Sequence, residues 1–203
     1  MRFDGRVTGA ILDPVLLVGE HVRLEPLGPQ HVEGLARASA DGEVWRKWTT
    51  WVPAPGQMAA TIEERIADHA RGRMVPWATC LPDGTPVGMT SYWDVDAPNR
   101  RVEIGATWLG ASAQGTKVNP EAKLLQLTRA FEDLDCIAVE FRTHWHNRQS
   151  RRAIEALGAK QDGVLRNHRI MPDGTLRDTV VYSIVRDEWP TVRAGLRARL
   201  RSA

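Results

Sequence analysis

Residues 111–123 read A-S-A-Q-G-T-K-V-N-P-E-A-K, a polar loop that turns directly into a helix. Leu124, Leu127 and Phe131 follow at the i, i+3 and i+7 spacing of one core-facing helix stripe. A helix that starts in this way presents unpaired backbone N–H groups and the positive end of its dipole to whatever lies in front of it. The stretch predicts an anion-binding helix start, with an ordinary capped surface helix as the alternative.

The helix start is expected near Pro120. Proline suits the first turn, where a missing N–H group costs little, and Asn119 before it is expected to cap the helix or to hold an unusual backbone angle.

The bulk numbers indicate one globular domain. The chain has 203 residues and 22.7 kDa, with 42% hydrophobic and 26% charged residues, which excludes two full-sized domains and extensive disorder. No apolar run is long enough to span a membrane, and the first residues lack the unbroken apolar core of a signal peptide. The two cysteines, Cys80 and Cys136, are expected to be buried thiols. We therefore expect a cytoplasmic protein with no membrane partner.

The charge balance does not favour a nucleic-acid partner. The formal net charge is only +2, and much of the excess lies in the C-terminal stretch R-A-G-L-R-A-R-L-R. Arg193, Arg197 and Arg201 follow helical spacing there, which is typical of a solvated helix face.

Strand and helix patterns alternate along the chain. A helix opens at Pro29, and another is predicted at 61–73 with a T-I-E-E capping box that starts at Thr61. A short helix over 147–157 is expected to stop at Gly158. The turn P-D-G-T-P joins two strands into a hairpin. The predicted strands are 21–27, 77–81, 87–95, 101–109, 138–143, 163–170 and 179–185.

The order of two motifs resembles the GCN5-related N-acetyltransferase (GNAT) superfamily. The loop-helix Q-G-T-K-V-N-P-E-A at 114–122 precedes a strand, and the strand precedes N-R-Q-S-R-R-A-I-E-A-L-G-A at 147–159. Within the superfamily, the resemblance is closest to the branch that includes the ribosomal-protein N-terminal acetyltransferases. The resemblance covers roughly residues 21–189. It implies an α/β fold: a central mixed, mostly antiparallel sheet of about seven strands, flanked by about four helices and a C-terminal helix. The sheet should splay between strands 101–109 and 138–143. The implied divisions are an arm at 1–19, the GNAT domain at 20–190 and a basic helix at 191–203.

The resemblance also implies acetyl-CoA as cosubstrate. The family's pyrophosphate loop usually carries glycines where this sequence has Lys117 and Asn119, so we expect Lys117 to add a phosphate contact and Asn119 to tolerate a left-handed backbone. Arg151 is a further candidate for the CoA phosphates. The implied cofactor-binding residues are Thr107, Trp108, Leu109, Gln114, Gly115, Thr116, Lys117, Val118, Asn119, Lys123, Asn147 and Arg152.

Three residues match family positions that carry the chemistry. Acetyl transfer to an amine needs a neutral amine and a stabilised thiolate. Glu103 matches a carboxylate that deprotonates the amine through water, although a structural carboxylate is the alternative. Asn147 and Ser150 match positions beside the thiol, and Ser150 is the candidate acid because Ile154 replaces the family's tyrosine. Both residues are also suited to cap the helix that starts there.

The acceptor side is expected to be aromatic. Trp45, Trp48 and Trp51 cluster in the segment that covers the acceptor site in relatives, and Trp93, Tyr182 and Asp178 lie on neighbouring strands. Such a cluster suits an aromatic, amphipathic or cationic amine, although core packing is the alternative for each tryptophan.

The expected function is acetyl transfer to a primary amine on a small molecule or peptide. A CoA-binding regulator without turnover remains the alternative, because the loop glycines and the tyrosine are missing. His144 and His146 share one strand face, but no third ligand accompanies them, so no metal is expected. A homodimer stays open, as do protein N-termini, aminoacyl conjugates, polyamines and small antibiotics as acceptors.

Overall fold

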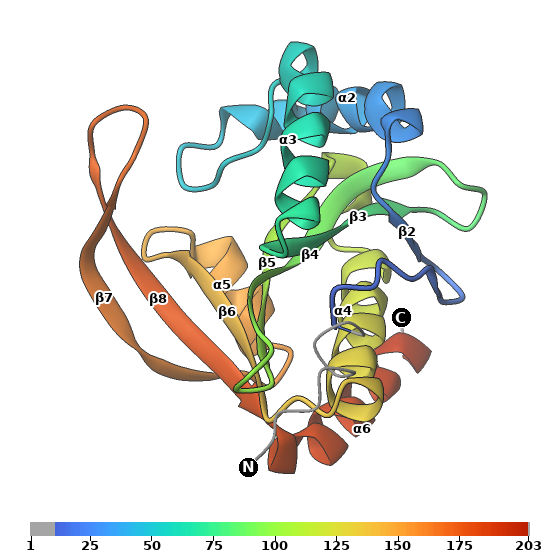
Figure 1. Ribbon diagram of the computed structural model, residues 1–203, viewed down its shortest axis with the longest axis vertical. Helices are drawn as coiled ribbons and strands as arrows, with labels where there is room; N and C mark the ends of the chain where they lie inside the picture. Colours follow the sequence, from blue (N-terminus) through green and yellow to red (C-terminus); the bar gives the residue numbers. More distant parts are fainter. Residues whose placement is uncertain (1–10, 203) are drawn as a thin grey trace.

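The computed structural model describes residues 11–202, which form an α/β fold around one open sheet (Figure 1). Over the described residues the sheet has eight strands in the order β1-β2-β3-β4-β5-β6-β8-β7, and every neighbouring pair is antiparallel except β5 and β6. The strands are β1 Leu17–Val18, β2 Arg23–Pro26, β3 Met74–Cys80, β4 Pro86–Asp96, β5 Arg101–Leu109, β6 Ala138–His144, β7 Lys160–Ile170 and β8 Leu176–Val185.

Helices cover both faces of this sheet. The α-helices are α2 Val32–Ala40, α3 Met58–Ala70, α4 Val118–Thr128, α5 Arg148–Glu155 and α6 Trp189–Arg201. The shorter turns are η1 Pro29–His31, η2 Asp41–Arg46, η3 Pro55–Gln57, η4 Ala111–Ala113, η5 Arg129–Asp133 and η6 Arg186–Glu188. In Figure 1, α2 and α3 lie together at the top, whereas α4 and α6 lie side by side at the lower right.

The sheet opens into a V between β5 and β6. These parallel strands pair only over residues 101–103 and 138–140, and then they separate (Figure 1). The predicted splay is confirmed. The two halves of the sheet are therefore β1–β5 on one side and β6, β8 and β7 on the other.

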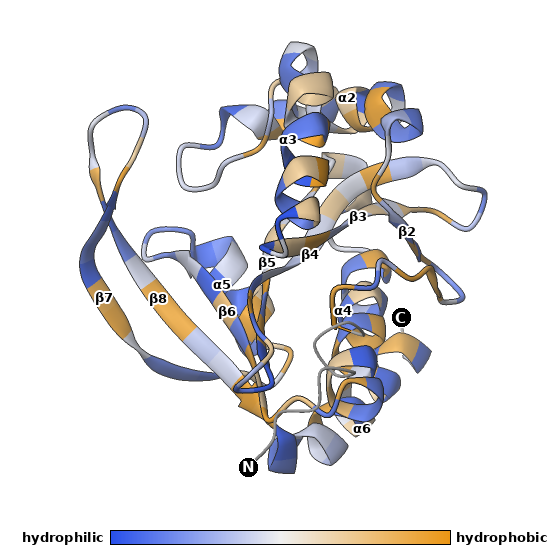
Figure 2. Ribbon diagram, viewed as in Figure 1, coloured by the Kyte–Doolittle hydropathy of each residue, from blue (hydrophilic) through white to orange (hydrophobic). Residues whose placement is uncertain are grey.

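Two apolar clusters hold the layers together. The larger one packs α4 and α6 onto the sheet through side chains such as Trp77, Tyr92 and Leu127, and the apolar residues of α4 and α6 appear as orange segments in Figure 2. The smaller one packs α2 and α3 onto the sheet through Leu35 and Ile62. Both cysteines are buried free thiols, as expected.

Two predicted helix starts are wrong. Helix α3 begins at Met58, and Thr61 lies inside it, where its hydroxyl donates to the carbonyl of Gln57 at 2.9 Å instead of capping. Helix α4 begins at Val118 with Lys117 as the N-cap residue, so Asn119 is already helical and needs no left-handed backbone. In both cases the chain enters the helix one turn or less before the residue with the capping side chain.

The two ends of the predicted domain lie against the rest of the fold. Residues 17–18 of the expected arm pair with β2, and the C-terminal helix begins at Trp189. Trp189 stacks on Phe131 with 5.5 Å between ring centroids, and its ring N–H donates to Glu132 at 2.8 Å. No helix in residues 11–202 is both long and apolar enough to cross a membrane.

Candidate active site

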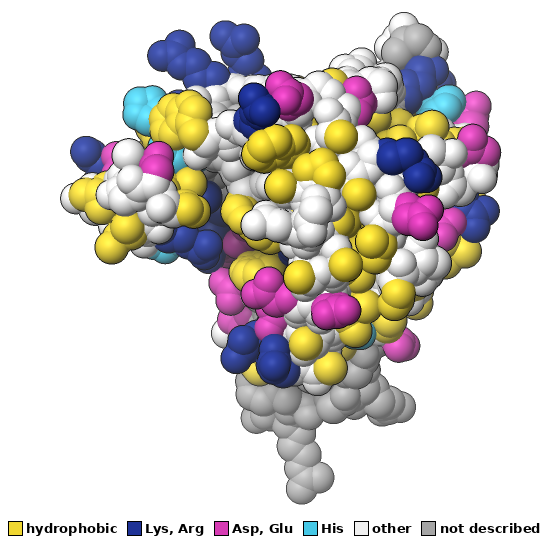
Figure 3. All heavy atoms as spheres, turned by 90° about the horizontal axis from the view of Figure 1, so that it is seen from above, with side chains coloured by type: hydrophobic (Ala, Val, Ile, Leu, Met, Phe, Trp, Pro, Cys, Tyr) yellow, Lys and Arg dark blue, Asp and Glu magenta, His cyan; other side chains and the backbone are white. Residues whose placement is uncertain are grey.

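A cavity of about 750 Å³ occupies the opening of the V. Its walls come from β5, the loop before α4, α5, β6, the β7–β8 hairpin and the segment before α3. Figure 3 looks into this end of the molecule and shows Lys and Arg side chains in the recess between the projecting hairpin at the left and the body. Seven Lys or Arg residues and three Asp or Glu residues line the cavity, so its walls favour an anionic ligand.

Strand β5 offers an unpaired backbone edge to this cavity. Beyond residue 103 it has no partner on the β6 side, and residues 103–109 all line the cavity. A bulge lies in the same stretch, because Ser91 pairs with Gly105 whereas Met89 pairs with Trp108. Ala106 has a φ of 49° there, in the left-handed region. The bulge and the missing partner leave backbone N–H and C=O groups free to bind an extended ligand.

Glu103 stands where the two halves of the sheet separate. Its side chain is only 11% exposed, and burial raises its pKa to about 7, against the opposing effect of Arg142. The Nε atom of Arg142 lies 3.6 Å from the Glu103 carboxylate, which is too long for a hydrogen bond. A carboxylate with a pKa near neutrality can accept a proton at physiological pH.

The loop and the first turn of α4 form the far wall. Gly115 has a φ of 75°, and a Cβ atom there would meet open space. The Thr116 hydroxyl donates to the carbonyl of Ala113 at 2.8 Å and accepts from the backbone N–H of Val118 at 3.3 Å. The Gln114 amide donates to the carbonyl of Leu109 at 2.7 Å. These bonds hold a curved loop in front of the helix N-terminus, the arrangement that binds phosphate groups.

Lys123 reaches from α4 to the floor of the cavity. It is 4% exposed, and burial lowers its pKa to about 7. Its amine donates to the hydroxyls of Thr90 at 3.0 Å and Thr107 at 3.2 Å, and to the Gln126 amide oxygen at 2.8 Å. The side chain is therefore engaged with uncharged groups beneath β4 and β5.

The start of α5 forms the opposite wall. Asn147 caps this helix by accepting the backbone N–H of Ser150 at 3.1 Å, and both residues line the cavity. Gln149 crosses the mouth, since its amide donates to Gln114 at 3.0 Å and accepts from Lys47 at 3.1 Å. Gly158 ends the helix region with a φ of 96°, as expected.

The structure separates the expected substrate-binding residues. Trp51 and Trp93 line the cavity, whereas Trp45, Trp48 and Tyr182 do not. Trp48 is 58% exposed and stands edge-on to the ring of His144, with 5.2 Å between centroids. Trp45 packs beside the smaller apolar cluster. Tyr182 is buried, and its hydroxyl donates to Glu155 at 2.7 Å and accepts from Arg151 at 3.1 Å.

The expected cofactor-binding residues divide in the same way. Lys117, Val118 and Arg152 lie outside the cavity lining. Arg151 also lies outside it, over the ring of Trp145. The remaining positions come together around the V: Thr107, Trp108, Leu109, Gln114, Gly115, Thr116, Asn119, Lys123 and Asn147.

Sequence reasoning missed several cavity residues. Arg65 from α3 is 7% exposed and stacks over Trp51 at 5.6 Å, and Arg199 from α6 also reaches the lining. Arg169 and Arg177 come from the β7–β8 hairpin. Alternating arginines in strands and helices are usually solvated, so their pattern alone carried no signal.

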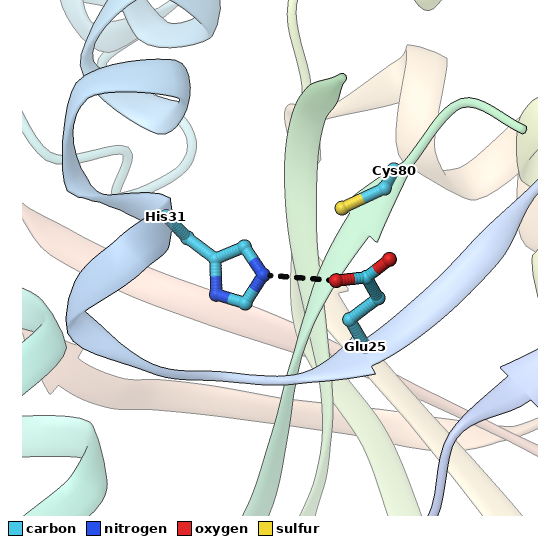
Figure 4. Close-up of side chains that lie close together, drawn as sticks. All are labelled: Glu25, His31 and Cys80. Carbon is cyan, nitrogen blue, oxygen red and sulfur yellow. Dashed lines mark hydrogen bonds and ion pairs between the residues drawn. The ribbon is translucent and has the colours of Figure 1, made fainter. Parts of the chain in front are cut away.

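A second cluster of polar side chains, outside the cavity lining, comprises Glu25, His31 and Cys80 (Figure 4). Nδ1 of His31 lies 3.1 Å from the backbone nitrogen of Gly28 and 3.2 Å from its carbonyl oxygen, and Nε2 lies 3.4 Å from the Glu25 carboxylate. Arg23 occupies the other carboxylate oxygen at 3.0 Å, and burial raises the pKa of Cys80 to about 12. The potential ligand atoms of Glu25 and His31 are thus engaged with each other, and we assign the cluster a structural role.

Comparison with known proteins identifies the family. The model of the acetyltransferase (GNAT) domain matches residues 21–160. YdaF of Bacillus subtilis strain 168, provisionally named a ribosomal N-acetyltransferase, is 29% identical over 177 residues, which is 85% of this chain and 95% of YdaF. The crystal structure of a provisionally assigned acetyltransferase from T. thermophilus is 39% identical and has a TM-score of 0.81, covering 93% of this chain and 98% of that one.

A GCN5-related N-acetyltransferase from Brucella melitensis is 27% identical and has a TM-score of 0.83, with 93% of this chain and 86% of that chain covered. The domain model spans more than half of the sequence, and the cavity lies where the sheet splays. The chain is therefore an N-acetyltransferase that belongs to the GNAT family.

Proposed function

We propose that the protein transfers an acetyl group from acetyl-CoA directly to a primary amine of a small molecule or peptide, with Glu103 as the general base. The observation that carries the proposal is the buried Glu103 carboxylate, whose pKa is raised to about 7 at the point where β5 and β6 separate. The name of YdaF supports a protein or peptide acceptor.

The residues that line the V fit acetyl-CoA. A cavity of about 750 Å³ is within the size range of ligand sites, and its excess of cationic side chains matches a phosphate-rich ligand. The loop at Gln114, Gly115 and Thr116 would hold the pyrophosphate, and the free edge of β5 would bind the pantetheine arm. Arg199, on the same lining, would reach a phosphate near the start of α4.

Glu103 takes the proton from the amine as the amine nitrogen bonds to the acetyl carbon and the carbon–sulfur bond breaks. A base with a pKa near 7 is ionised in half of the molecules at neutral pH and is still basic enough to accept the proton. The backbone groups of the β5 bulge would donate to the carbonyl oxygen as it gains negative charge. Ser150, at the start of α5, would donate a hydrogen bond to the departing sulfur.

The test is steady-state kinetics of Glu103→Gln with a panel of amines, read as CoA thiol release. The variant should lower kcat by a factor on the order of 10² to 10⁴ and lose the rise of rate centred near pH 7, while calorimetry gives unchanged affinity for acetyl-CoA. Glu33→Gln, on the exposed face of α2, is the matched control and should behave like the wild type. Wild-type rate and pH profile in Glu103→Gln would show that the carboxylate is structural.

The regulator alternative gives a different result in the same assays. A regulator without turnover would bind acetyl-CoA and release no thiol with any amine. Measurable thiol release that depends on the amine concentration rules it out.

A further inference from the structure

The β7–β8 hairpin sets two arginines directly opposite each other beside the cavity. Arg169 of β7 is the cross-strand partner of Arg177 of β8, and both line the cavity. Like charges at directly opposite positions of an antiparallel pair destabilise the sheet. Burial and the charge of Arg169 lower the pKa of Arg177, which is a further sign that the pair costs free energy without a counterion.

The neighbouring acids are engaged elsewhere. Arg142 of β6 contacts Glu103, Glu140 and Asp94 within 3.6 Å. Glu103 is the acid that acts electrostatically on both hairpin arginines: its charge raises the pKa of Arg177, and the charge of Arg169 lowers the pKa of Glu103. In residues 11–202 no carboxylate lies within ion-pair distance of Arg169 or Arg177.

The remaining contacts of the pair are uncharged. The Nε atom of Arg177 donates to the hydroxyl of Thr179 at 3.0 Å, and Nδ1 of His168 contacts the same hydroxyl at 3.0 Å. Thr179 and His168 also line the cavity. The contact through Nε fixes the guanidinium of Arg177 and leaves its terminal nitrogens for a ligand.

A third arginine of the hairpin shows the contrast. Arg166 lies on β7, outside the cavity lining, and its Nε donates to Asp178 at 2.6 Å. The hairpin therefore supplies an acid to the arginine that is away from the cavity and none to the two that line it.

We propose that Arg169 and Arg177 form a subsite for an anionic group, a carboxylate or a phosphate, carried by the same acceptor molecule whose amine is acetylated. The proposal rests on the proposed function and specifies its acceptor class. A guanidinium fork matches the oxygens of both groups, and two adjacent forks offset the charge of an oxyanion that enters the cavity. The start of α4, where the CoA phosphates would bind, lies on the other side of the V (Figure 1), so the hairpin arginines are free for the acceptor.

Glu103 and the arginine pair contact different groups of the acceptor. Glu103 takes the amine proton at the base of the V, and the arginines hold the anion on the hairpin. Acceptors with an amine alone would lack the second contact, so their kcat/KM should be lower.

The test compares matched acceptors. One pair is a tetrapeptide amide with aspartate at its second position and the same peptide with asparagine there, and the other is phosphoethanolamine and ethanolamine. The wild type should prefer the anionic member of at least one pair by about tenfold or more in kcat/KM. The pair that shows the preference tells whether the source is a peptide carboxylate or a small phosphate.

The variants Arg169→Gln and Arg177→Gln should bring this ratio close to one, and Arg177→Lys should keep part of it. Arg166→Gln is the matched control from the same hairpin and should keep the wild-type ratio. No preference in the wild type for either anionic acceptor, or a full preference in Arg177→Gln, overturns the subsite.

Calorimetry of the same four acceptors on the CoA-loaded protein separates this proposal from the proposed function. Turnover without preference leaves the function standing and removes the subsite. Preferential binding that Arg177→Gln abolishes, in a protein that turns over no amine, leaves the subsite standing and removes the function.

Discussion

Glu103 depends on Gly105 for its position. A Cβ atom added at Gly105 would lie 2.6 Å from a carboxylate oxygen of Glu103, closer than real side chains allow. The glycine has an ordinary extended backbone, so its role here is the space that it leaves. The carboxylate of Glu103, two residues earlier in β5, occupies this space.

Gly105→Ala should therefore displace the Glu103 carboxylate. We expect kcat to fall by about tenfold or more, because a proton acceptor must lie within hydrogen-bond reach of the amine. Gly163→Ala is the matched control, since Gly163 also lies in a strand and an added Cβ would meet nothing within 4 Å. Equal kcat in both variants, measured under saturating acetyl-CoA, would contradict this account.

The raised pKa of Glu103 also has a cost in stability. The folded protein holds this proton up to a pKa of about 7, whereas the unfolded chain releases it near the ordinary value of 4.5. The folded state thus binds more protons between these values, and the free energy of unfolding falls as the pH rises through them. Glutamine has no proton to release, so the free energy of unfolding of Glu103→Gln should not fall over this pH range. At pH 8 the variant should be more stable than the wild type by on the order of 1–3 kcal/mol.

Urea unfolding of both proteins at pH 5 and pH 8 measures the effect. The advantage of the variant should be small at pH 5 and larger at pH 8. An advantage that does not grow with pH would mean that Glu103 titrates normally.

Individual residues were predictable only where local chemistry decides them. Asn147 caps α5 as its side chain suggests. The family resemblance points to Glu103, whereas its burial beside Arg142 and Gly105 arises from the arrangement of the sheet. Asn119 does not cap α4, because a capping side chain near a helix start does not fix the residue at which the chain enters the helix.

At the scale of elements, α4 holds the N-terminal segment as well as the loop. Glu121, in its first turns, is 7% exposed and accepts the backbone N–H groups of Glu20 at 3.0 Å and His21 at 2.6 Å. Gly19 packs against the same carboxylate. This charged acceptor ties the segment between β1 and β2 to the helix that starts the candidate phosphate site.

Glu121→Ala should leave two backbone donors without an acceptor. We expect the free energy of unfolding to fall by about 2–3 kcal/mol, as is typical when charge-assisted bonds in a partly buried place are lost. Glu33→Ala, whose side chain is 90% exposed, is the control and should leave the denaturation midpoint unchanged. A Glu121 variant as stable as this control would show that solvent replaces the lost bonds.

Elements with strong periodicity were predictable to within about three residues: β3, for example, is expected at 77–81 and lies at Met74–Cys80. Strand β5 has the predicted bounds 101–109, and the hairpin β3–β4 follows its turn signal. Strand β1 was missed because two residues carry no periodicity, and its partner β2 decides it. The start of α3 was misplaced because Pro55 and the turn η3 lead the chain into the helix before Thr61.

At the scale of the whole molecule, acetyl-CoA is expected to bridge the two halves of the sheet. Residues 104–109 of β5 lack a neighbour on the β6 side, so their backbone groups face the cavity. Hydrogen exchange should therefore slow at these residues and at the loop 114–119 when acetyl-CoA is added. The stabilisation should approach about 2.7 kcal/mol at a concentration one hundred times Kd.

Strands β2 and β3, which pair with each other away from the cavity, are the internal control in the same exchange experiment. They should show only the change that follows from global stability. Protection confined to β2 and β3, with none at 104–109, would contradict binding along β5.

The arrangement of the whole sheet followed from the family resemblance, because neither composition nor periodicity orders strands. The arginine pair of the hairpin illustrates why the sequence alone does not predict which residues lie opposite each other. Its register depends on the shift between Leu165 and Arg169, and an irregularity of one residue would turn Arg169 to the other face. Such long-range placement is decided by packing of the complete chain.

The open V has a consequence for the life of the protein in a cell. The two halves of the sheet meet over three residue pairs, so acetyl-CoA bound between them would raise the free energy of unfolding. Proteases act on the unfolded fraction, so the steady-state amount of this protein should follow the supply of acetyl-CoA and CoA even when its synthesis is constant. Starvation for the cofactor would then lower the enzyme's abundance as well as its rate.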